Sequence, residues 1–166
     1  MLKEISIRDA WKNKYPEQVV CVTTVDSAGR GNIIPLGWFM PTSFNPPMCA
    51  ISVGHTRYSH KLLTRSGEFV VAFPAEGSEE DVHYCGTHSG RDVDKFKETD
   101  FTAAPASQVS APLLEECLVN FECQVAGKLD TGDHTIFAGG IVAAHVNEEA
   151  GRRIYNTGDY VFRAFG

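Results

Sequence analysis

The sequence predicts a mainly β fold, an antiparallel β-barrel with a few short helices. Three observations predict it: strand-like runs dominate the chain, two long runs flank a tight turn, and only three segments have helical character. Many short strands with few helices between them are typical of closed or nearly closed antiparallel barrels. Because there is no internal repeat and no linker, we expect one domain over residues 1–166, with its core at about 15–165.

The expected strands are apolar or β-branched runs that end at turn residues. They are Gln18–Val25, Asn32–Met40, Met48–Val53, Glu68–Phe73, Leu118–Leu129, His134–Val146 and Tyr160–Phe165. The segment Asp26–Gly29 is the turn between the first two strands. Two consecutive prolines predict that Pro41–Pro47 is a turn. The clearest hairpin surrounds Asp130–Asp133, since that loop holds the glycine that such turns need.

Three segments have helical signals. The first runs from about Arg57 to Thr64 and ends near Gly67, with Thr56 as its N-cap. The second starts at Ser78, whose hydroxyl precedes a carboxylate three residues later, as in a capping box. A third, short helix covers Asp92–Lys97.

Composition and charge exclude several classes of protein. The chain has 43% apolar residues and a formal net charge of −6. Because no basic face or run of like charges is evident, nucleic acid and anionic membranes are not expected partners. The N-terminus lacks a signal sequence, and no run reaches the roughly 18 apolar residues of a membrane span. Five scattered cysteines without a CxxC motif indicate reduced thiols in a cytoplasmic protein.

No metal site is expected from the sequence. His83, Cys85 and His88 lie within six residues. They lack a second group of ligands at the spacing of a zinc site. We therefore interpret them as helix or loop residues, and the roles of Cys85 and His88 stay open.

The segment Ser52–Lys61 combines a strand end, a glycine and a helix start. Gly54 allows a sharp turn, and the first turn of the helix leaves N–H groups without intrahelical partners. Arg57, Ser59 and His60 add a guanidinium, a hydroxyl and an imidazole at this end. Such a helix start can bind a phosphate. An ordinary helix with a solvated arginine explains the same residues, so the residues alone leave both readings open.

Several segments, taken in order, resemble the flavin reductase-like family of FMN-binding split barrels, and above all its flavoredoxin-type members. They are Asn32–Pro47, Gly54–His60, Cys85–Phe96, Gly132–Ile136 and Tyr155–Tyr160. The likeness covers about residues 15–165. It implies a Greek-key-like barrel of six antiparallel strands. It also implies a homodimer in which each barrel holds one FMN near the subunit interface.

The resemblance also implies roles for particular residues. Arg57, Ser59 and His60 would hold the phosphate, with Thr56 close by. The ring and the ribityl chain would be lined by Asn32, Trp38, Thr42 and Ser43, and backbone groups would come from Ser52, Val53 and Gly54. Lys95 would reach the flavin and stabilise negative charge on it, and His134 would orient the nicotinamide. FAD is a less favoured cofactor than FMN.

The function that follows from the resemblance is an NAD(P)H-dependent oxidoreductase. It would pass electrons from NADH or NADPH through FMN to a flavin, a metal or a protein acceptor. The sequence does not choose between the two nicotinamides, does not identify the acceptor, and does not show whether FMN stays bound. One alternative is an FMN-binding electron-transfer protein without nicotinamide turnover. Another is a related pyridoxamine-phosphate oxidase-like barrel that binds a different phosphate-bearing ligand.

Overall fold

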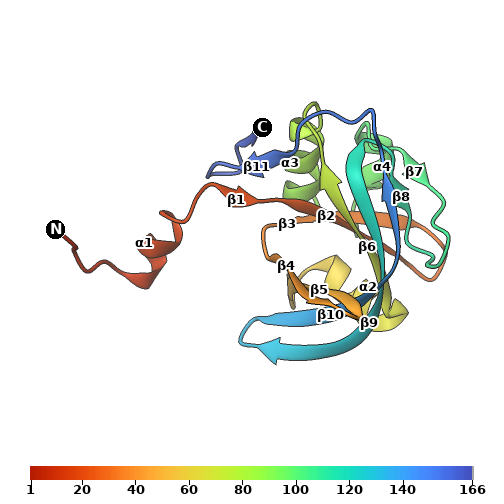
Figure 1. Cartoon of the computed structure of the whole chain (residues 1–166), viewed down its shortest axis with the longest axis horizontal. Helices are drawn as coiled ribbons and strands as arrows, with labels where there is room; N and C mark the ends of the chain where they lie inside the picture. Colours follow the sequence, from red (N-terminus) through yellow and green to blue (C-terminus); the bar gives the residue numbers. More distant parts are fainter. Residues whose placement is uncertain (166) are drawn as a thin grey trace.

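The computed structural model describes residues 1–165 (Figure 1). Within that range the main sheet is antiparallel, with seven strands in the order β3-β2-β6-β9-β10-β5-β4. The elements are α1 (Ile7–Trp11), β1 (Glu17–Gln18), β2 (Val20–Val25), β3 (Gly31–Leu36), β4 (Phe39–Phe44), β5 (Pro47–Gly54), α2 (Tyr58–Ser66), β6 (Glu68–Pro74), α3 (Glu79–Thr87), α4 (Lys95–Glu98), β7 (Ala103–Ala104), β8 (Leu113–Leu114), β9 (Cys117–Thr131), β10 (His134–Val146), β11 (Ile154–Asn156) and β12 (Phe162–Ala164).

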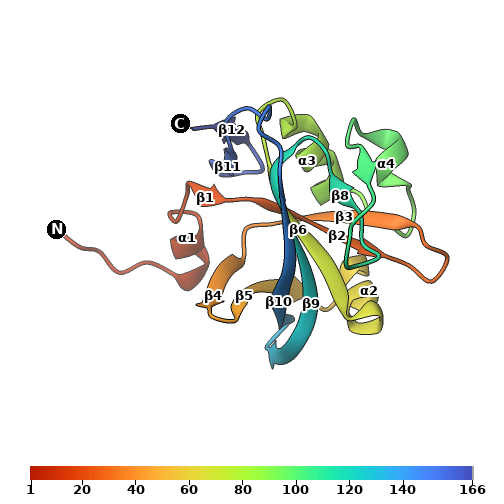
Figure 2. The same cartoon turned by 45° about the vertical axis from the view of Figure 1, so that its right-hand side comes forward.

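The main sheet curls so that its two edge strands, β3 and β4, follow each other in the chain. Only Gly37 and Trp38 separate them, and the Trp38 carbonyl accepts a hydrogen bond from the Ser52 N–H of β5 at 3.0 Å. If β3 and β4 are counted as one interrupted strand, the seven described strands form a six-stranded circuit. Figure 2 shows β2 and β3 turned strongly relative to β6, β9 and β10. The predicted mainly β split barrel is confirmed.

The barrel interior is filled by apolar side chains from alternate strand positions. They include Val20, Val22, Ile51, Val53, Phe69, Val71 and Phe137, each at most 1% exposed. Burying a side chain of this size contributes about 1.5–3 kcal/mol relative to exposure. Gly139 of β10 gives Phe69 its room, because a Cβ there would lie 2.6 Å from Phe69 Cζ.

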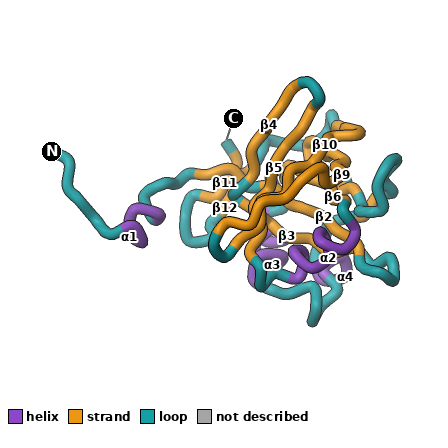
Figure 3. Tube along the Cα trace, turned by 90° about the horizontal axis from the view of Figure 1, so that it is seen from below, coloured by secondary structure: helices purple, strands orange, loops and turns teal. Residues whose placement is uncertain are grey.

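A second apolar layer joins α3, α4 and the C-terminal strands to the outer face of β2 and β3. Ile33 of β3 packs with Val82 and Cys85 of α3 and with Ile154 of β11, all at most 1% exposed. Figure 3 shows α2, α3 and α4 on one side of the strands, with α1 apart on the N-terminal arm. This layer holds the segment after α3 beside β3, where the cavity lies.

The predicted turn at Pro41–Pro47 is wrong, because most of it is strand β4. Only Asn45 and Pro46 form the turn to β5. Pro41 fits in β4 because this is an edge strand and a register shift follows it, positions at which proline is tolerated. The expected strand Asn32–Met40 is likewise broken at Gly37 and Trp38, where the chain passes from one sheet edge to the other.

The other strand predictions differ from the structure mainly at their ends. β10 has the predicted bounds, and β9 extends two residues beyond Leu129. The last strand, expected over Tyr160–Phe165, covers only Phe162–Ala164. Asp159 and Tyr160 have φ values of 50° and 58° and form a turn in the left-handed region before it.

The three predicted helices are present as α2, α3 and α4, α1 was not predicted, and the two predicted side-chain caps are absent. α2 ends at Gly67, whose φ of 70° is typical of a glycine C-cap. Its N-cap is Arg57 rather than Thr56, without a side-chain cap bond. Ser78 does precede α3, but its hydroxyl donates to the Ala75 carbonyl instead of capping the helix. The third helix, expected over Asp92–Lys97, is the single turn of α4.

Candidate functional site

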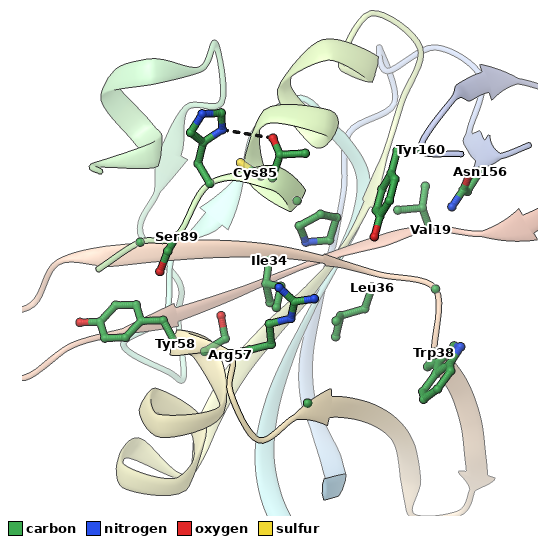
Figure 4. Close-up of a pocket in the computed structure, with 18 of the residues that line it drawn as sticks. Val19, Ile34, Leu36, Trp38, Arg57, Tyr58, Cys85, Ser89, Asn156 and Tyr160 are labelled. Carbon is green, nitrogen blue, oxygen red and sulfur yellow. Dashed lines mark hydrogen bonds between the residues drawn. The ribbon is translucent and has the colours of Figure 1, made fainter. Parts of the chain in front are cut away.

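A cavity of about 440 Å³ lies between β3, the turn from β5 to α2, and the segment after α3 (Figure 4). This volume is within the range of small-molecule and cofactor sites, about 300–1,000 Å³. The walls come from segments far apart in the chain: Tyr15, Glu17–Val19, Asn32, Ile34–Trp38, Ser52, Gly54, Thr56–Ser59, Cys85–Arg91, Lys95, His134, Asn156, Asp159, Tyr160 and Phe162. The tertiary fold therefore assembles this site.

One end of the cavity is the start of α2. Gly54 ends β5, and its carbonyl accepts a hydrogen bond from the Arg57 N–H at 3.0 Å, so the chain turns sharply into the helix. Arg57 extends from the N-cap position into the cavity (Figure 4). An arginine beside the positive end of a helix dipole is suited to bind an anion.

Asn32 of β3 carries a buried acceptor without a partner. The side chain is 4% exposed, and its amide nitrogen donates to Ser59 Oγ at 2.8 Å and Thr24 Oγ1 at 3.3 Å. Its Oδ1 has no hydrogen-bond partner among the described residues. Such an atom costs about 1–3 kcal/mol if nothing satisfies it. This oxygen is itself buried against Gly90, where a Cβ would overlap it, so a ligand reaches it only if the Gly90 backbone shifts.

Lys95 lies at the base of the cavity and is 4% exposed. Its Nζ donates to the carbonyls of Ile33 at 2.7 Å and Cys85 at 2.6 Å. These two bonds use two of the three donors of an ammonium group. Burial lowers the pKa of Lys95. The side chain is thus a buried, fixed cation that connects β3 to α3.

An aromatic wall lies close to Gly54 and the base of the Arg57 side chain. The rings of Trp38 and His134 have centroids 4.8 Å apart, and Trp11 of α1 lies 5.8 Å beyond Trp38. His134 Nδ1 donates to the Asp133 carboxylate at 2.6 Å, which lowers the pKa of that carboxyl. His134 Nε2 then faces Gly54, 3.4 Å from where a Cβ would stand. The hydrogen bond to Asp133 thus fixes the orientation of the imidazole in the cavity wall.

The structure brings nine of the residues predicted from sequence to the cavity wall. They are Asn32, Trp38, Ser52, Gly54, Thr56, Arg57, Ser59, Lys95 and His134. Four predicted residues lie elsewhere. Thr42 and Ser43 are on the edge strand β4, and Val53 is fully buried in the barrel core. His60 faces β10, where its Nε2 lies 2.9 Å from Thr135 Oγ1.

Sequence reasoning missed much of the wall that follows α3. Ser89, Gly90 and Arg91 line the cavity, and so do Asn156 and Tyr160 near the C-terminus. Both segments resemble the family, and this resemblance was the sequence signal that could have identified these residues as part of the site. Nothing in their local pattern, however, shows that they face the same cavity as Arg57.

Cys85 and His88 belong to this wall without forming a metal centre. Burial raises the pKa of Cys85 to about 12, so its thiol stays protonated. The ring of His88 stacks on Tyr84, with centroids 3.9 Å apart. Within residues 1–165, no three His, Cys, Asp or Glu side chains are grouped as metal ligands. None of the helices described is both long and apolar enough to span a membrane.

Comparison with known families and sequences gives consistent results. The model of the flavin reductase like domain matches residues 12–163. An uncharacterized protein of Archaeoglobus fulgidus is 37% identical over 77% of this chain and 71% of its own length. The NADH-dependent FAD reductase of Streptomyces globisporus is 31% identical over 78% of this chain and 70% of its own length.

Solved structures share the whole fold. Flavoredoxin of Desulfovibrio vulgaris (Miyazaki F) is 25% identical, with a TM-score of 0.86 over 100% of this chain and 94% of that one. An FMN-binding protein from Thermus thermophilus, solved with bound 1-cyclohex-2-enone, is 24% identical. Its TM-score is 0.86 over 99% of this chain and 94% of that one. At that identity the second likeness supports the fold alone.

Proposed function

Because the chain belongs to the flavin reductase-like family, we propose that it is an FMN-binding oxidoreductase of flavin reductase type. It passes electrons from NADH or NADPH through FMN to a flavin, metal or protein acceptor. One observation carries this function. The cavity joins an arginine at a helix start, the polar side chain of Asn32, and an aromatic wall. These features suit a phosphate, a polar chain and a planar ring.

The residues present are compatible with FMN. Arg57, with Thr56 and Ser59, would bind the phosphate at the start of α2, where positive charge and N–H donors converge. Asn32 lines the cavity, and its amide N–H holds Ser59 in place at the helix start. Trp38 offers an apolar face for the ring. Thr42, Ser43, Val53 and His60 are not part of this proposal, because they lie outside the cavity.

The protein's task is to position the cofactor and to control charge. Bound flavin supplies the hydride chemistry itself. Lys95, held by two carbonyls, provides a fixed positive charge under the cavity, and a buried charge acts strongly at low dielectric. His134, oriented by its hydrogen bond to Asp133 and its contact with Trp38, would orient the nicotinamide. Its role is orientation rather than acid–base catalysis.

We also propose that the protein is a cytoplasmic homodimer. Strand β4 is a sheet edge with unpaired backbone groups, and it exposes Met40 and Phe44, which are 53% and 96% exposed. An apolar sheet edge in water favours association with another chain. The five cysteines are all free and buried, which favours a reducing compartment. Sedimentation of the purified protein tests the dimer; a monomer that binds flavin normally would contradict it.

The decisive experiment for the function uses the spectrum of the purified protein. We expect FMN to bind to the apoprotein and its absorbance to bleach when NADH or NADPH is added without oxygen. Stopped-flow reduction with each nicotinamide gives the rate and the preferred donor. Bleaching much slower than turnover would favour the electron-transfer alternative, in which a protein donor reduces the flavin. A protein that binds neither FMN nor FAD would refute the function.

A further inference from the structure

A second arginine lies at the same end of the cavity as Arg57. Arg91 follows α3, and its Nη2 donates to the carbonyl of Thr56 at 3.3 Å. Its guanidinium also lies 5.5 Å from the centre of the Tyr58 ring. Arg91 therefore spans from the segment after α3 to the turn before α2 and reaches both neighbours of Arg57. All of these residues line the cavity.

The charges of the two arginines are not offset by carboxylates. Within residues 1–165, the arginine–carboxylate ion pairs are Arg30 with Asp26 and Arg152 with Glu76. The buried ammonium of Lys95 is a third cation nearby, since the charge of Arg57 contributes to the lowering of its pKa. A chain with a net charge of −6 thus gathers uncompensated positive charge at one place. This arrangement matches a ligand group with more than one negative charge.

The position of Arg91 depends on the packing of the preceding residue, Gly90. Gly90 packs against Asn32, and a Cβ at Gly90 would overlap Asn32 Oδ1 and lie 2.9 Å from Cγ. Asn32 is 4% exposed and is itself bound to Ser59 at the helix start. The close backbone approach brings Arg91 to Thr56. Its position therefore depends on packing within the cavity wall.

We propose that Arg91 makes the cavity selective for a flavin ending in a phosphate monoester (FMN) over a flavin diphosphate (FAD). This inference rests on the proposed function and concerns the same site. A phosphate monoester carries a charge of about −1.5 to −2 at pH 7 and has three acceptor oxygens. The phosphate of FAD at this position carries one charge and has lost one oxygen to the bridge. Two arginines therefore stabilise the monoester more strongly.

The contacts of Arg91 with Thr56 and Tyr58 hold its guanidinium beside the start of α2. The two arginines therefore present a preformed pair of positive charges on the cavity wall.

Flavin titrations of the apoprotein test this proposal. Wild-type protein, Arg91→Ala and Arg91→Lys are each titrated with FMN, FAD and riboflavin, with quenching of flavin fluorescence as the signal. Arg65→Ala is the matched control, because it removes an arginine from the exposed last turn of α2. Loss of a charge-assisted contact predicts FMN binding about ten- to a hundredfold weaker in Arg91→Ala. We expect FAD to be affected less and riboflavin not at all, with Arg91→Lys between wild type and Arg91→Ala.

The outcomes separate this inference from the proposed function. Wild-type protein that binds FAD as tightly as FMN would overturn the selectivity while leaving the flavin site intact. The same applies if Arg91→Ala weakens FMN and FAD equally. If Arg91→Ala weakens riboflavin binding as much as FMN binding, then Arg91 stabilises the cavity wall and does not bind the phosphate. Failure of wild-type protein to bind any flavin would refute the proposed function itself.

Discussion

Substitution of Gly90 by alanine tests how tightly the cavity wall is packed. The backbone of Gly90 is not in the left-handed region, so alanine strains no dihedral angle, and its effect is steric. Its Cβ would overlap Asn32 Oδ1 and lie 3.3 Å from Tyr58 Cδ1. Asn32 cannot move away without losing its buried bonds to Ser59 and Thr24. Overpacking and lost buried bonds each cost about 1–3 kcal/mol, so we expect destabilisation in that range.

Two assays follow the effect of Gly90→Ala. Urea denaturation of the apoprotein gives the change in unfolding free energy, and FMN titration gives the change in affinity. We expect both to fall, because the displaced segment carries Arg91 as well as contacting Asn32. Gly127→Ala on β9 is the control, since its Cβ would have no heavy atom within 4 Å. It should stay within about 0.5 kcal/mol of wild type. Gly90→Ala with the stability and FMN affinity of this control would disprove the packing argument.

Three further predictions concern single side chains. Arg57→Ala should weaken FMN binding about ten- to a hundredfold in titrations, and unchanged affinity would remove Arg57 from the site. His134→Ala should slow reduction by nicotinamide about two- to tenfold in stopped-flow experiments while lowering flavin content less; the opposite order would reverse its role. Burial raises the pKa of Glu122, but hydrogen bonds from Ser107, His145 and Gln108 outweigh it and lower the pKa from 4.5 to about 2. A lowered pKa contributes stability that is present above pH 4.5 and lost as the pH falls through 2, about 3 kcal/mol in all. Glu122→Gln should flatten this acid-dependent loss in denaturation curves, and an unchanged pH dependence would contradict the assignment.

The strand and helix pattern could be predicted from sequence because its signals are local. β-branched runs, a glycine at the tip of the β9–β10 hairpin and a glycine after α2 depend on neighbours within a few residues. The turn prediction at Pro41–Pro47 was wrong because the deciding contacts are not local. Proline excludes a central strand but not an edge strand, and edge position depends on pairing with β5. Sheet position is decided by partners far along the chain.

The candidate site also has features that the sequence predicted and features that depend on the tertiary fold. The helix start at Arg57 and the family resemblance were readable along the chain, and nine predicted residues do line one cavity. Local pattern could not show that His60 turns to Thr135, or that Arg91 reaches Thr56, 35 residues away. Which way a side chain faces is decided by the packing of distant segments, since burial and hydrogen-bond satisfaction are properties of the whole fold. The chain alone therefore specified the chemistry available, and the tertiary structure decided which of these groups share a cavity.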